Sequence, residues 1–81
     1  MGAMDHWFHP MTRRRREDEL AVPGVIRGRK AYLAAEADVT VGDILVDGQN
    51  GAQEYAVTRV TEAIGHSGVD HLEAAVRKLS S

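Results

Sequence analysis

Residues 38–60 have the sequence DVTVGDILVDGQNGAQEYAVTRV, a pattern that is typical of two β-strands joined by a turn. Apolar and mostly β-branched residues gather in two runs, 44–46 and 55–60. In the loop between the runs, Asp47 and Asn50 each precede a glycine, and such dipeptides supply the positive φ angles of tight or bulged turns. The stretch therefore predicts a β-hairpin.

Side chains alternate along a strand, and this alternation assigns faces to the second run. Tyr55, Val57 and Arg59 fall on one face, so we expect Tyr55 and Val57 to reach the core. Before the first run, Gly42 and Asp43 mark a bend.

Shorter signals precede the predicted hairpin. Val39 and Val41 alternate with polar residues and predict a further short strand before the bend. Residues 25–26 are a β-branched pair, and residues 30–35 (KAYLAA) suit a second strand, although their alanines suit a helix equally well.

Residues 70–79 (DHLEAAVRKL) satisfy two patterns. Their apolar residues repeat at helical spacing after Asp70, a typical capping residue, so local propensity favours a helix. As a strand, the segment would place Leu72, Ala74 and Val76 on one face.

Residues 1–21 show no sustained apolar period, and we interpret them as a flexible arm, with residues 1–3 as a cloning remnant. The arm is basic because it contains four consecutive arginines, Arg13, Arg14, Arg15 and Arg16. A solvated tail and a contact with DNA or an acidic surface both agree with such a run. Trp7 and Phe8 favour a hydrophobic anchor that inserts into a partner.

Val22, Pro23 and Gly24 form a turn signal, and we expect a single small β domain over residues 22–81. The chain has 81 residues and no cysteine, so its core must be thin and neither disulfides nor thiolate metal sites support it. Residues 1–30 hold seven basic and four acidic side chains (net +3), whereas residues 31–81 hold three basic and eight acidic ones (net −5). No apolar run or signal-type N-terminus indicates contact with a membrane.

The order of segments in this chain resembles that of the head-tail joining (head-completion) proteins of long-tailed bacteriophages. The segments are VTVGDILV, a glycine-containing turn, EYAVTRV, a polar loop and HLEAAVRKL. The similarity covers about residues 29–79, and the N-terminal portion and the longer turn depart from the family pattern. The matching positions are Gly42, Asp43, Leu45, Tyr55, Val57, Val60, His71 and Leu72. The resemblance implies a small β-barrel or sandwich of five to six antiparallel strands, in which residues 70–79 are the last strand. An α+β fold with a helix over residues 70–79 is the alternative.

The same resemblance implies a protein of the virion, made in the host cytoplasm, that has no catalytic activity and no cofactor. Such a protein is a monomer when free, adds to the portal or adaptor ring of a DNA-filled head as a homo-oligomeric ring, and presents the surface on which the tail docks. We expect the basic arm to contact the portal, a neighbouring subunit or exiting DNA, while the barrel supplies the lateral interfaces. The turn with Asp47, Gln49 and Asn50 is a further candidate for contact with a partner.

The remaining polar clusters do not satisfy the requirements of a reactive site. His6 and His9 lack a third metal ligand, and the polar residues between His66 and His71 lie too close together in one loop to supply both a nucleophile and an oxyanion site. The chief rival function is a small nucleic-acid-binding barrel in which residues 13–16, Arg27, Arg29 and Lys30 follow phosphates, and the acidic body argues against it.

Overall fold

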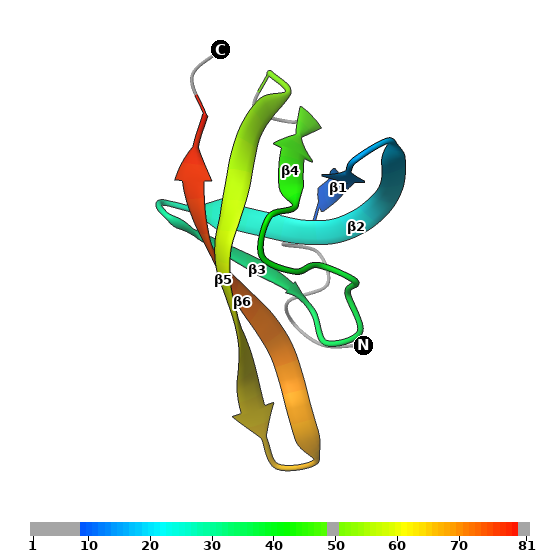
Figure 1. Cartoon of the computed structure of the whole chain (residues 1–81). Helices are drawn as coiled ribbons and strands as arrows, with labels where there is room; N and C mark the ends of the chain where they lie inside the picture. Colours follow the sequence, from blue (N-terminus) through cyan, green and yellow to red (C-terminus); the bar gives the residue numbers. More distant parts are fainter. Residues whose placement is uncertain (1–8, 49–50, 80–81) are drawn as a thin grey trace.

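The computed structural model describes residues 9–48 and 51–79, which form a closed barrel of antiparallel strands (Figure 1). The strand order is β1-β2-β3-β6-β5-β4, and β4 pairs with β1 to close the barrel. The small, mostly β barrel predicted from the sequence is confirmed. The strands are β1 (His9–Arg15), β2 (Asp18–Arg27), β3 (Lys30–Ala34), β4 (Ile44–Asp47), β5 (Gln53–Gly65) and β6 (Gly68–Lys78).

The core is small and draws on every strand. Its centre is made of leucine, valine and alanine side chains that alternate with outward-facing residues, as a barrel requires. The buried apolar residues are Met11, Val22, Ala31, Leu33, Val39, Leu45, Tyr55, Val57, Leu72, Ala74 and Val76.

The predicted hairpin over residues 44–60 is confirmed as β4 and β5, and Tyr55 and Val57 lie in the core as expected. The prediction that Arg59 shares their face is wrong. Thr58 is an extra residue in β5, because Val57 pairs with Val76 whereas Arg59 already pairs with the adjacent Ala75. This β-bulge shifts the alternation by one residue, so Val60 packs against the core and Arg59 is exposed.

The last segment is the strand β6, and the alternative of a helix over residues 70–79 is wrong. β6 pairs with β3 on one side and with β5 on the other, so its backbone bonds are satisfied by neighbours far away in the sequence. Leu72, Ala74 and Val76 point into the barrel as the strand interpretation requires. Tertiary pairing therefore overrides the local helix propensity.

The predicted flexible arm over residues 1–21 is wrong from His9 onwards, and the folded domain does not begin at residue 22. Residues 9–15 form β1 and residues 18–21 belong to β2, and these two strands close the barrel between β4 and β3. Met11 contributes to the core, and ion pairs hold the arginine run. His6, Trp7 and Phe8 lie outside the described residues. The hydrophobic anchor at Trp7 and Phe8 and the interpretation of His6 therefore stay predictions.

Val22, Pro23 and Gly24 do not form a turn but lie in the middle of β2. Pro23 pairs with Pro10, so the two residues that lack an N–H group face each other across β1 and β2. Gly24 is required by close packing. A Cβ atom there would lie 2.7 Å from Cδ2 of Leu33 and 2.8 Å from the carbonyl oxygen of Tyr32.

The predicted short strand at Val39 and Val41 is also wrong, because this segment is part of a loop over residues 35–43. Val39 is buried and closes one end of the core, whereas Val41 is exposed. The loop is fixed to β5 by two backbone hydrogen bonds, from Gly42 N–H to the carbonyl of Val57 and from Val57 N–H to the carbonyl of Asp43, both 2.9 Å.

A hairpin of β5 and β6 extends beyond the barrel, as Figure 1 shows at the bottom of the view. β4 pairs with β5 only over Gln53–Ala56 and β3 pairs with β6 only over His71–Ala75, so the outer part of the hairpin has no strand beside it. We call residues 61–70 the hairpin tip. All of them except Ala63 are exposed.

The close packing at Gly24 gives a stability prediction. Gly24→Ala should lower the free energy of unfolding by about 2 kcal/mol, because the backbone of β3 must move to admit the methyl group. Gly48→Ala is the matched control, since nothing lies within 4 Å of a Cβ atom there. Urea unfolding of the two variants measures the difference, and equal stabilities would contradict this account of β2.

Candidate functional site

The arginine run lies in β1 and in the turn that follows it, and the pleat of the strand divides it between two faces. Arg13 and Arg15 point towards the loop over residues 35–43, whereas Arg14 lies on the opposite face. Arg16 lies in the turn to β2 with a positive φ of 57° and is exposed. The run is therefore part of the fold.

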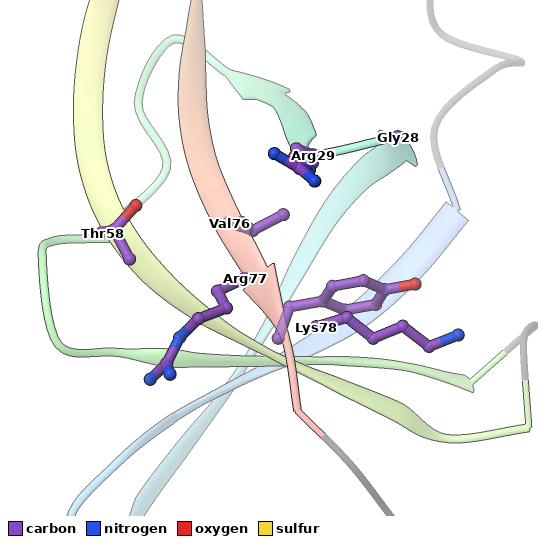
Figure 2. Close-up of a pocket in the computed structure, with 7 residues that line it drawn as sticks. Gly28, Arg29, Thr58, Val76, Arg77 and Lys78 are labelled. Atoms are coloured by element: carbon purple, nitrogen blue, oxygen red, sulfur yellow. The ribbon is translucent and has the colours of Figure 1, made fainter.

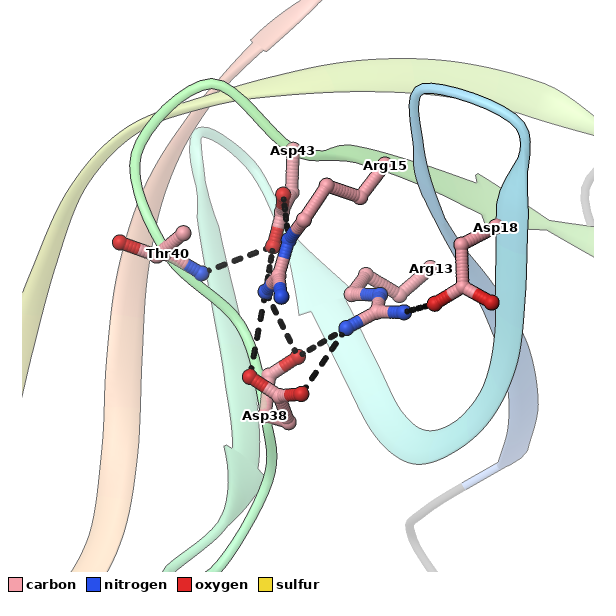
Figure 3. Close-up of polar contacts among 6 residues, drawn as sticks. All are labelled: Arg13, Arg15, Asp18, Asp38, Thr40 and Asp43. Carbon is pink, nitrogen blue, oxygen red and sulfur yellow. Dashed lines mark hydrogen bonds and ion pairs between the residues drawn. The ribbon is translucent and has the colours of Figure 1, made fainter.

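Arg15 binds the buried carboxylate of Asp43 in a bidentate ion pair (Figure 3). Its Nε donates to Oδ1 at 2.8 Å and its Nη2 donates to Oδ2 at 2.9 Å. The backbone N–H of Thr40 donates to Oδ2 of Asp43 at 2.9 Å, so the carboxylate has three donors. The sequence interpretation of Asp43 as the end of a bend is thus only part of its role, because it also anchors β1.

Arg13 is fully buried, with 1% of its surface exposed, and is shared between two acids. Its Nη2 donates to Asp18 at 2.7 Å, and its Nη1 donates to the side chain of Asp38 at 3.1 Å and to the carbonyl of the same residue at 3.2 Å. Asp38 also accepts a bond from Arg15 at 3.1 Å (Figure 3). The two guanidinium groups therefore hold the loop against the barrel end.

The outer arginine of the strand, Arg14, forms weaker and more exposed pairs. It donates to Glu54 of β5 at 3.0 Å and to Glu19, its cross-strand neighbour in β2, at 3.4 Å. The acids that follow the arginines in the sequence are thus their partners across a tight turn. Basic residues of β1 thus face acidic residues of β2 across a two-residue turn, and such cross-strand pairs are a sequence signal for a hairpin. The interpretation of the run as a solvated tail overlooks this signal.

These ion pairs shift proton affinities in opposite directions. The Arg15 guanidinium lowers the pKa of Asp43, with a further contribution from the Thr40 N–H bond, while the carboxylates of Asp43 and Asp38 raise the pKa of Arg15. Because the folded chain lowers the pKa of Asp43, this pair stabilises the fold above the unfolded value of 3.8 and loses its contribution as the pH falls through the folded one.

The positions that carry the family resemblance have structural roles. Five of them are buried, two are partly buried, and Gly42 adopts a left-handed φ of 97° that favours glycine. The buried ones are Asp43, Leu45, Tyr55, Val57 and Leu72, and the partly buried ones are Val60 and His71. Asp47 ends β4 opposite Gln53, whereas Gln49 and Asn50 lie outside the described residues.

A hollow of about 760 Å³ lies where the turn between β2 and β3 faces the end of β6 (Figure 2). Three cations line it: Arg29 in the turn, and Arg77 and Lys78 at the end of β6. Tyr55 and Val76 supply apolar surface, and the remaining lining residues are Gly28 and the bulged Thr58. We call this the basic hollow. Its cations come from sequence positions that share no local motif, which is why sequence analysis does not identify it.

The hairpin tip has the opposite character. Ile64 and Val69 pair across the strands and are exposed, at 71% and 36%. Residues 61–70 contain two acids, Glu62 and Asp70, and no lysine or arginine. The tip is therefore an acidic ribbon with an apolar pair near its end.

His71 lies at the base of the tip between two carboxylates. Its Nδ1 is 2.8 Å from Asp70 and its Nε2 is 3.0 Å from Glu73, and its ring lies 6.0 Å from that of Tyr32. The two carboxylates, Asp70 first, raise the pKa of His71 above 6.5. Conversely, bonds from His71 and Lys30 lower the pKa of Glu73. This cluster fixes the base of the hairpin.

Over residues 9–48 and 51–79, no group of three or more His, Cys, Asp or Glu side chains has the arrangement of a metal site. In the same ranges, no helix has the length and hydropathy that a bilayer crossing requires. Comparisons of the chain with protein-family models, curated proteins and solved structures found no match.

The burial of Arg13 predicts unequal effects along the run. Arg13→Ala should lower the free energy of unfolding by about 3 kcal/mol, because it removes the partner of two carboxylates and leaves a cavity. Arg14→Ala, at an exposed position, should leave stability close to that of the wild type. Urea unfolding tests this, and equally small effects would show that the run is solvated.

The cluster around His71 predicts a titration. In an NMR titration, the ring of His71 should show a pKa above 6.5, and Glu73→Gln should lower it because a carboxylate partner is lost. Glu62→Gln, on the same hairpin, is the control and should leave the value unchanged. The favourable contribution of His71 to stability is complete below pH 6.5 and is lost as the pH rises through the folded pKa. An unaltered value in Glu73→Gln would contradict the described geometry.

Proposed function

We propose that this chain is a non-enzymatic assembly protein of the virion that joins the DNA-filled head of a tailed bacteriophage to its tail. The observation that carries the proposal is the β5–β6 hairpin that extends from a closed barrel and exposes Ile64 and Val69. The family resemblance of residues 29–79 agrees with it.

The barrel and the hairpin differ in what they offer a partner. A closed barrel has no free strand edge and is rigid, so it suits a repeated unit of a ring. The hairpin tip has two free edges and an apolar pair, and a two-stranded ribbon alone is only marginally stable in water. A surface of this kind gains stability when a partner covers it.

The rival function in nucleic-acid binding loses its main argument. Arg13 is buried, and Arg14 and Arg15 are paired with acids, so the run is not an arm that follows phosphates. The basic hollow, which three cations line, still supports an interaction with a polyanion. A joining protein that adds to the portal or adaptor ring and presents a docking surface to the tail accounts for both the hairpin and the barrel.

The experiment is complementation with tail-less, DNA-filled heads from a phage or prophage that carries this gene, with the gene deleted. Purified wild-type protein should restore tail attachment and infectivity. The double variant Ile64→Ser/Val69→Ser should restore at least tenfold less, because it removes the apolar pair without touching the core. Val41→Ser is the matched control, since Val41 is as exposed but lies outside the hairpin.

Circular dichroism first establishes that the variants fold. Heads that stay tail-less after addition of the wild-type protein would refute the proposed function. Full activity of the double variant would refute the role of the hairpin tip.

A further inference from the structure

We infer that the hairpin tip of one copy of this chain docks into the basic hollow of the next copy. The inference deepens the proposed function, on which it rests, by naming the contact that would build the ring. The inference is carried by opposite charges on the β5–β6 hairpin, with acids at its tip and cations at the end of β6, beside the hollow.

The basic hollow holds cations without acids. Arg29, Arg77 and Lys78 line it, and none of its lining residues is acidic. Within the described ranges no ion pair is formed by these three side chains, whereas Arg13, Arg14, Arg15 and Lys30 all have carboxylate partners. The fold therefore pairs Arg13, Arg14, Arg15 and Lys30 with acids and leaves the three cations around this hollow with no acid among its described lining residues.

The hairpin tip supplies the complementary chemistry. Glu62 is an exposed acid with no ion pair in the described ranges, and Asp70 is exposed although it also pairs with His71. Ile64 and Val69 form an apolar pair beside them. The hollow offers mainly its cations, since its two apolar lining residues, Tyr55 and Val76, are largely buried in the core. Its volume of about 760 Å³ holds a few side chains. A projecting hairpin turn can enter a hollow of this size, whereas a flat protein surface cannot.

A chain cannot fill its own hollow with its own tip. Arg77 in the hollow lies nine positions after Gly68 at the turn, a distance of about 30 Å along an extended strand. The contact must therefore be made between copies, and it joins two different surfaces. Such a heterologous contact, between two different surfaces, generates a closed ring when the rotation from one subunit to the next divides a full turn evenly.

The expected contact is weak and depends on salt. Exposed opposite charges contribute little each and are screened beyond about 8 Å at physiological ionic strength. Free subunits would then stay apart, while subunits held side by side on a portal ring have a high effective concentration and associate. This matches the expectation of a free monomer that assembles on the head.

Cysteine cross-linking tests the contact, and the natural chain contains no cysteine. One variant carries Ser67→Cys in the turn of the tip, and a second carries Thr58→Cys in the hollow, which keeps all three cations. Mixed under mild oxidation, they should form the heterodimer at least tenfold faster than Thr58→Cys does with Val41→Cys, a control in an exposed loop. High salt should slow the reaction to the control rate.

Charge reversal then tests the chemistry of the contact. Arg77→Glu in the hollow variant should slow cross-linking severalfold, and Glu62→Lys in the tip variant should restore it. Glu36→Lys, the same change of charge at an exposed acid in the loop over residues 35–43, should not restore it. Rates equal to the control, or no difference between the two lysine variants, would overturn the inference.

Duplex DNA provides the competing outcome. If wild-type protein binds DNA, if Arg77→Glu abolishes that binding, and if cross-linking stays at the control rate, the hollow is a nucleic-acid site and the inference is overturned. The outcomes are separable from those of complementation. Restored tails without cross-linking would refute only this contact, whereas cross-linking without restored tails would support the contact and refute the head-tail role.

Discussion

The bidentate ion pair between Arg15 and Asp43 fixes the closure of the barrel. β1 closes the sheet between β2 and β4 but contributes little apolar surface, because three of its seven residues are arginines. Backbone pairing holds β1 to β2 and β4, and the acids of the loop over residues 35–43 add ion pairs to it, with Asp43 in turn held by Thr40. A chain of this size buries a small core, so such a polar network has a large share in holding the barrel end.

This use of the arginines decides where the free positive charge of the molecule lies. The densest cationic segment of the sequence faces inward or pairs with acids, and the exposed cations that remain together come from separate segments, at Arg29, Arg77 and Lys78. The acidic ribbon of the hairpin tip lies at the far end of the same two strands. Charges of opposite sign therefore lie near the two ends of β6, and this arrangement favours contacts between unlike surfaces over contacts between like ones.

The sequence predicts the parts of the fold whose signals are local. The alternation and turn residues of residues 44–60 identify β4 and β5, and the strand pattern of Leu72, Ala74 and Val76 agrees with β6. It does not predict β1, because a local charge run is typical of a solvated tail. Asp18 lies only five residues from Arg13, but the acids that fix Arg13 and Arg15 to the loop over residues 35–43 lie 25 and 28 residues away. The bulge at Thr58, which turns Arg59 outward, leaves no mark in the sequence. The candidate site is missed for a similar reason, since only the barrel brings Arg29 next to Arg77.

The long hairpin contains a second irregularity that balances the first. The extra residue Thr58 in β5 moves the pairing by one position, and the extra residue Asp70 in β6 moves it back, so Ile64 pairs with Val69 in the same register as Val57 with Val76. Each bulge adds twist to the ribbon. The direction in which the projection leaves the barrel is thus set by two single residues outside the core. Insertions or deletions at these positions would re-aim the projection while the barrel is preserved.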